Sequence, residues 1–119
     1  MSKPKTVTLI IFESAYGKER AWNALRMAQG LVAKGIGVNI FLIEDGVNGA
    51  KKGQKPPEGY YNLEKMLEGL IKGGVKVRAC ITCLKARGLA QEDLVAGVEI
   101  GKTLELGDWI MESHAVISF

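Results

Sequence analysis

The chain has 119 residues, enough to bury one hydrophobic core without disulfide or metal support. Hydrophobic residues make up 47% and charged residues 24%, the composition of a soluble globular protein. The net charge of +3, with no block of like charges, does not indicate direct nucleic-acid or membrane binding. No stretch approaches the roughly 20 apolar residues of a membrane span. We therefore expect one domain over residues 1–119, located in the cytoplasm.

Strand and helix patterns alternate in the first half of the chain. Residues 6–12 form a β-rich apolar run, which predicts a strand buried on both faces. Residues 18–34 have apolar side chains at helical spacing, and residues 38–43 predict a second buried strand. The polar segment 47–61 predicts a long loop, since its lysines, prolines and glycines form no regular pattern. Its lysines are either a solvated surface or a docking face for a partner.

The second half continues the alternation and sets the fold class. Asn62 predicts the start of a helix with an apolar stripe at Leu63, Met66, Leu67, Leu70 and Ile71. The other expected elements are a strand at 75–79, short elements at 92–95 (helix) and 98–100 (strand), a helix at 103–112 and a strand at 115–119. Helix-length connections between strands call for parallel pairing. The order predicts an α/β fold, a three-layer α/β/α sandwich on a mainly parallel sheet of about five strands.

Two cysteines, Cys80 and Cys83, lie where the third predicted strand ends and a short predicted helix begins. Parallel sheets present reactive groups at the carboxyl ends of their strands, and a helix N-terminus lowers the pKa of a cysteine there. If Cys80 is the N-cap, the amides of Thr82 and Cys83 point back at its sulfur. We therefore predict that Cys80 is the more reactive thiol and is alkylated first. Cys83 is either its partner thiol or a packed residue.

The CxxC spacing suits redox or metal chemistry better than a structural disulfide. Structural zinc needs four ligands, and His114 is the only histidine. We expect no zinc site within one chain, with ligands pooled across an oligomer as the alternative. Neither GxGxxG nor GxxxxGK[ST] occurs, so no nucleotide cofactor is expected.

Several short motifs together resemble one family over essentially the whole chain. They are Ala15-Tyr16-Gly17, Asp45-Gly46-Val47, Gly53-Gln54-Lys55-Pro56, Glu58-Gly59-Tyr60, Cys80 with Arg87-Gly88, Gly97-Val98-Glu99-Ile100-Gly101 and the closing Ala-Val-Ile-Ser-Phe. This combination resembles the DsrE/DsrF/TusD sulfur-relay family, and its YchN-like branch in particular. The resemblance implies a single DsrE-like domain that assembles as a homotrimer or homohexamer.

The resemblance also implies a chemistry, because characterised members carry sulfur as a cysteine persulfide between protein partners. Their active cysteine stands seven residues before the arginine of an Arg-Gly pair, which here is Cys80 before Arg87. The sequence departs from the relay proteins at Cys83 and at Ala86. We expect a sulfur-handling protein, a sulfurtransferase or sulfur carrier, that exchanges sulfur at Cys80 with donor and acceptor proteins. The alternatives are a CxxC dithiol redox protein and a non-catalytic oligomeric ligand-binding subunit.

Overall fold

The computed structural model describes residues 5–119 as a five-stranded sheet in the order β4-β3-β2-β1-β5. Every strand pair is parallel. The strands are β1 (Thr6–Ile11), β2 (Gly37–Leu42), β3 (Lys76–Cys80), β4 (Glu99–Gly101) and β5 (Ala115–Ser118). All five were predicted, with bounds that differ by one or two residues.

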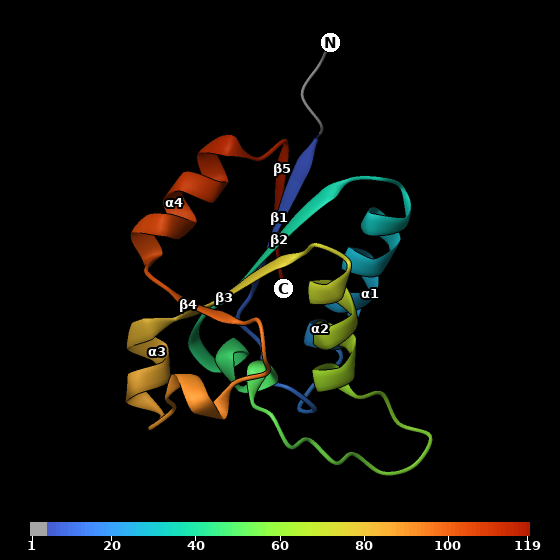
Figure 1. Ribbon diagram of the computed structural model, residues 1–119, viewed down its shortest axis with the longest axis vertical. Coiled ribbons are helices and arrows are strands. Elements are labelled where there is room, and N and C mark those ends of the chain that lie inside the picture. The colour runs from blue at the N-terminus through green and yellow to red at the C-terminus, as the bar shows by residue number, and fades with distance from the viewer. Residues whose placement is uncertain (1–4) are drawn as a thin grey trace.

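The helices cover both faces of this sheet, as Figure 1 shows. They are α1 (Arg20–Ala33), α2 (Leu63–Lys72), α3 (Ile81–Ala86) and α4 (Thr103–Glu112). The connections β1-α1-β2 and β2-α2-β3 advance the same way along the sheet, so right-handed crossovers place α1 and α2 on one face. The connection through α4 returns from β4 to β5 at the far edge, which places α4 on the opposite face. The predicted three-layer sandwich is confirmed.

The core lies on both faces of the central strands. Side chains of β1 and β2 are almost completely buried, as their continuous apolar runs predict. On the α4 face the ring of Phe41 meets Trp109 edge-on, with ring centroids 6.1 Å apart. Asn62 caps α2 as predicted, because its side-chain oxygen accepts a hydrogen bond from the Lys65 amide at 3.0 Å.

The prediction of a loop from residue 47 onward is wrong at its start. Residues Glu44–Ala50 form a 3₁₀-helix, η1, in which Val47 and Ala50 are fully buried. Gly46 lets η1 lie directly on β1, since a Cβ atom there would sit 2.0 Å from the Ile11 carbonyl oxygen. The irregular loop therefore runs only from Lys51 to the cap of α2. The short helix expected at 92–95 is a second 3₁₀-helix, η2, at Gln91–Asp93.

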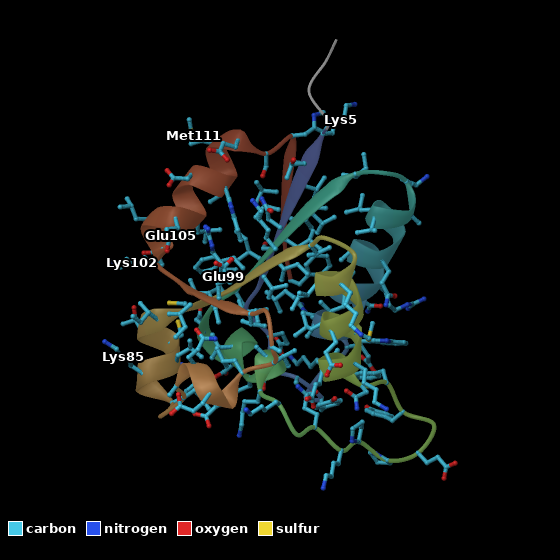
Figure 2. The ribbon with its side chains drawn as sticks, viewed as in Figure 1. Lys5, Lys85, Glu99, Lys102, Glu105 and Met111 are labelled. Atoms are coloured by element: carbon cyan, nitrogen blue, oxygen red, sulfur yellow. The ribbon has the colours of Figure 1, made fainter. Side chains whose placement is uncertain are left out.

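Apolar side chains remain exposed on α4 and on the edge strand β5. Leu104 is 79% and Met111 86% exposed, and Figure 2 shows Met111 on the outer side of α4. Val116 and Ile117 of β5 are also exposed. No helix within residues 5–119 has the length and apolar character needed to cross a membrane.

Candidate functional site

The two cysteines lie together at the carboxyl edge of the sheet. Cys80 is the last residue of β3 and the N-cap of α3, with extended backbone angles (φ −60°, ψ 123°). Cys83 lies in the first turn of α3, and both thiols are free. The sequence placed them at this junction correctly. Cys80 is buried, with 2% of its surface exposed, whereas Cys83 is half-buried.

The surroundings shift the two thiols in opposite directions. Burial raises the pKa of Cys80, but hydrogen bonding from the side chains and amides of Cys83 and Thr82 outweighs burial and leaves that pKa below its ordinary value. Burial and the hydrogen bond to Cys80 raise the pKa of Cys83, against smaller opposing effects of the Glu44 amide and Arg87. These opposite shifts make Cys80 the more acidic thiol of the pair.

The expected capping of the Cys80 sulfur by the first-turn amides is only partly formed. No backbone N–H makes a hydrogen bond of full capping geometry to the Cys80 side chain. Helix α3 has six residues, so its macrodipole is also weaker than that of a long helix. Hydrogen bonds from the Cys83 and Thr82 side chains also lower the pKa of Cys80. The sequence pattern did not indicate these side-chain contacts.

Cys83 is held from the other side by η1. The backbone N–H of Glu44 donates a hydrogen bond to the Cys83 sulfur at 3.1 Å. Glu44 has φ +52°, a left-handed conformation that side-chain-bearing residues seldom adopt. A strained conformation of this kind persists only where the surrounding structure holds it in place. In this conformation the Glu44 amide points at the Cys83 sulfur. No pattern in the sequence indicates this contact, since Glu44 and Cys83 are 39 positions apart.

Arg87 contacts Asp45 and the backbone of Cys83 rather than the Cys80 sulfur. Its guanidinium donates to the Asp45 carboxylate at 2.7 and 3.2 Å and to the backbone carbonyl of Cys83 at 3.1 Å. The hydrogen bonds that the Arg87 guanidinium donates to Asp45 raise the pKa of Arg87 above its ordinary value. The ion pair between Asp45 and Arg87 joins η1 to the end of α3.

Access differs between the two sulfurs. Cys80, which pairs with Gly101 in the sheet, has 2% of its surface exposed, whereas Cys83 is half-buried. A reagent approaching the folded chain therefore meets Cys83 first, even though Cys80 is the more acidic thiol. The expectation that Cys80 is alkylated first holds only if local opening exposes it.

His114 is not part of this site. It precedes β5, and its amide donates a hydrogen bond to the Thr6 carbonyl at the start of β1. This is the amino-terminal end of the strands, whereas Cys80 lies at the carboxyl end. Within residues 5–119, no three His, Cys, Asp or Glu side chains gather where they could hold a metal ion.

Comparison with known proteins places the chain in a family. The model of the DsrE/DsrF-like family matches residues 5–119. The chain belongs to the DsrE/DsrF-like family. It is 49% identical over 113 residues to the uncharacterized protein MK0008 of Methanopyrus kandleri, covering 95% of this chain and 93% of that protein. It is 36% identical over 115 residues to protein YchN of Escherichia coli, covering 95% and 97% of the two chains.

Two further likenesses refine this placement. The crystal structure of E. coli YchN matches with a TM-score of 0.90 and 37% identity, over 98% of this chain and 100% of that one. A sulfurtransferase TusD homolog of Vibrio parahaemolyticus is 31% identical over 90 residues, which is 74% of this chain and 69% of that protein. The resemblance to the sulfur-relay family and its YchN-like branch is thereby confirmed.

Proposed function

We propose that this DsrE-like domain is a sulfur-handling protein in which Cys80 takes up sulfane sulfur as a persulfide and passes it to a partner. The observation that carries the proposal is the placement of two free cysteines together at the carboxyl end of β3, with Cys80 as the N-cap of α3 and Cys83 in its first turn. Cys80 has a lowered pKa, and Cys83 has a raised pKa and donates to it. A thiolate is the form of cysteine that attacks sulfur. Relatives named sulfurtransferase TusD support the same chemistry.

The uptake step is a displacement at sulfur. When local opening exposes Cys80, its thiolate attacks the outer sulfur of a donor such as thiosulfate, the bond between the two donor sulfurs breaks, and sulfite leaves with the electron pair. The product is a persulfide anion on Cys80. In delivery, the thiolate of an acceptor protein attacks the terminal sulfur and Cys80 leaves as a thiolate. Neither step needs an outside oxidant or reductant.

The proximity of the two thiols also favours a second function, a dithiol redox cycle. The Cys83 thiolate can attack the inner sulfur of the Cys80 persulfide, which releases sulfide and closes a Cys80–Cys83 disulfide. A reducing dithiol is then required to restore the pair. Without a persulfide the same two cysteines can still cycle between dithiol and disulfide with an external thiol–disulfide partner, and a non-catalytic subunit would do neither.

Intact-mass spectrometry after exposure to thiosulfate or polysulfide separates these functions. The sulfur-handling proposal expects a gain of about 32 Da per sulfur in the parent and in Cys83→Ser, and none in Cys80→Ser. The redox alternative expects a loss of about 2 Da in the parent and no lasting gain. Sulfur uptake by Cys80→Ser but not by Cys83→Ser would reverse the assigned roles. A parent that changes mass in neither way would remove both functions.

We further propose that the protein is a homo-oligomer, a trimer or a hexamer. Its support is the exposed apolar surface formed by α4 and the unpaired edge of β5, which includes Leu104, Ile110, Met111, Val116 and Ile117. Monomeric proteins seldom expose neighbouring large apolar side chains, and an open edge strand invites pairing. Light scattering should show a mass of about three or six times 12.9 kDa. A monomer at micromolar concentration would contradict it, and Met111→Lys should weaken the assembly.

A further inference from the structure

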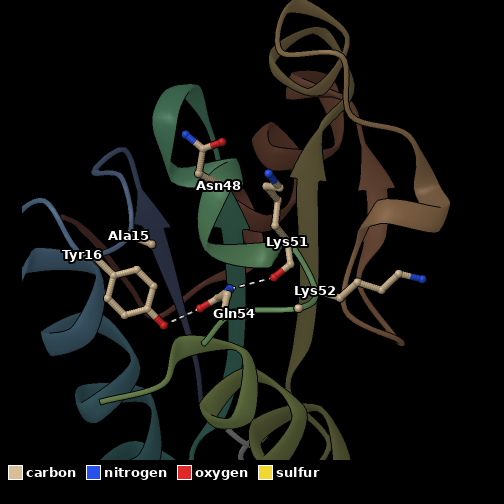
Figure 3. Close-up of a pocket in the computed structure, with 7 residues that line it drawn as sticks. Ala15, Tyr16, Asn48, Lys51, Lys52 and Gln54 are labelled. Atoms are coloured by element: carbon tan, nitrogen blue, oxygen red, sulfur yellow. Dashed lines mark hydrogen bonds between the residues drawn. The ribbon is translucent and has the colours of Figure 1, made fainter. Parts of the chain in front are cut away.

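A groove with positively charged walls runs along the segment between η1 and α2, beside the cysteine site. Its first hollow, of about 360 Å³, opens between Tyr16, after β1, and the end of η1 (Figure 3). A second hollow of about 240 Å³ continues along Pro56 and Pro57 to Tyr60. Tyr16 and Gln54, whose side chains are hydrogen-bonded to each other, line both hollows, so the two adjoin at this pair. We call this surface the basic groove because its lysines are Lys51, Lys52 and Lys55.

The loop that builds the basic groove is held rigidly by Gln54. The Gln54 side-chain nitrogen donates to the carbonyls of Gly49 and Lys51 at 3.0 and 2.8 Å. Its oxygen accepts from the Tyr16 hydroxyl at 2.5 Å and from the Glu64 amide at 3.3 Å. The backbone amide of Gln54 in turn donates a hydrogen bond to the Glu64 carboxylate at 2.8 Å. A surface fixed in this way loses little conformational entropy when a ligand binds.

The wall residue Tyr16 is strained. It has φ +66°, and Tyr16 and Glu44 are the non-glycine residues with positive φ within the part of the chain that the structure describes. Its hydroxyl makes two hydrogen bonds: it donates to the Gln54 side chain and accepts from the Leu63 amide at 3.1 Å. Backbone strain of this kind clusters at ligand-binding and active sites. Glu44 contacts the cysteine site, and Tyr16 forms the groove.

The lysines of the basic groove form no salt bridge with any of residues 5–119. Lys51, Lys52 and Lys55 are all exposed. The salt bridges among residues 5–119 join Arg78 to Glu105 and Arg87 to Asp45, and neither involves these lysines. No acidic residue lines either hollow. The complementary ligand is therefore negatively charged.

The neighbouring aromatic rings argue against a single-stranded nucleic acid as that ligand. Tyr61 stacks on Trp22 at 4.8 Å and on Tyr60 at 4.5 Å, and Arg26 covers the Trp22 ring at 4.6 Å. Trp22 and Tyr61 use these ring faces inside the protein, and Tyr60, 51% exposed, offers one ring, whereas single-stranded nucleic-acid sites stack successive bases on several rings. A small anion is also disfavoured, because the lysines are exposed and small-ligand sites enclose most of their ligand.

We propose that the basic groove docks an extended, acidic segment of a partner protein. An extended chain fits two consecutive hollows, and its carboxylates meet the unpaired lysines while the apolar parts of its side chains contact Tyr60 and Pro57. The inference rests on the proposed function in one respect, since a sulfur relay requires a protein partner at this edge of the sheet. Asn48 of η1 lines the groove, and Glu44 at the start of the same 3₁₀-helix contacts Cys83, so one short element connects the groove to the cysteine site.

The test is binding of a fluorescein-labelled peptide of four Glu-Ala repeats, followed by fluorescence anisotropy and by amide chemical shifts. We expect shifts at Tyr16 and the loop lysines, and binding that weakens as salt is added. The triple variant Lys51→Gln/Lys52→Gln/Lys55→Gln should bind about 3- to 100-fold more weakly, as expected for the loss of three exposed charge pairs. The matched control Lys34→Gln/Lys72→Gln/Lys76→Gln loses the same charge at the other edge of the sheet and should bind as the parent does.

Three results would overturn the proposal. Equal weakening in both triple variants would show that only net charge matters. Tighter binding of inorganic pyrophosphate or of a dT oligonucleotide at the same residues would show a different ligand class. Absence of peptide binding to the parent would leave the lysines as a solvated surface. Mass gain of the parent from thiosulfate, measured without peptide, tests the proposed function separately, so either proposal can fail while the other stands.

Discussion

Replacing Gly46 with alanine should destabilise the protein by about 1–3 kcal/mol, because η1 lies too close to β1 for a side chain. The new Cβ would stand 2.0 Å from the Ile11 carbonyl oxygen and 2.8 Å from its carbon, where real Cβ contacts essentially never fall below 3.0 Å. Both contacts are with backbone, so no rotamer change relieves them. Residues Glu44–Ala50 must move outward by about 1 Å or more.

Gly49→Ala is a matched control in the same 3₁₀-helix. Its Cβ would meet only Leu63 Cδ1, at 4.0 Å, so alanine should be neutral or stabilise by about 0.4–1 kcal/mol through the unfolded state. A chain of 119 residues loses about 4 °C of melting temperature per kcal/mol. Circular dichroism should therefore show Gly46→Ala melting about 4–12 °C below the parent. If both alanine variants melt together, the close packing of η1 on β1 is wrong.

Three other predictions concern the site and its supports. Asn62→Ala should cost about 0.5–2 kcal/mol in urea unfolding because the Lys65 amide loses its acceptor, whereas Asn62→Asp should cost little; equal losses would exclude capping. Sulfur uptake should rise with pH as Cys80 loses its proton, and in Cys83→Ala the rise should move to higher pH than in Cys83→Ser, which keeps a hydroxyl donor; coincident profiles would show that Cys83 does not acidify Cys80. Arg87→Gln should increase hydrogen exchange of η1 amides, since it removes the ion pair to Asp45, while Lys85→Gln on the same helix should not; unchanged exchange would mean that Arg87 does not brace η1.

The sheet and its main helices could be predicted because their signals are local. Continuous apolar runs identified β1 and β2, and helical spacing identified α1, α2 and α4. Element η1 was missed because its two glycines and its 3₁₀ geometry give no helical period, and its burial depends on contact with β1 and α2. Its Val47 side chain, alone among polar and small neighbours, resembled a loop residue.

The site was predictable only in part for the same reason. The position of Cys80 and Cys83 followed from the order of strand and helix in one short stretch. Their partners did not, because the Glu44 amide and the Asp45 carboxylate are 39 and 42 positions away from Cys83 and Arg87. Parallel strands bring these loops to one edge, but which atom meets which depends on the turn that η1 makes. The burial of Cys80 beneath that turn was equally hidden from the sequence.

The most direct test of the central claim is to locate the transferred sulfur in the parent protein. After exposure to thiosulfate and trapping with iodoacetamide, trypsin cleavage after Arg78 and Lys85 releases one peptide that contains both cysteines. Fragmentation of that peptide assigns each modification to one residue. We predict the extra sulfur of about 32 Da on Cys80, with Cys83 carrying only the trapping group. Extra sulfur on Cys83 alone, or on neither cysteine, would contradict the proposal that Cys80 carries the persulfide.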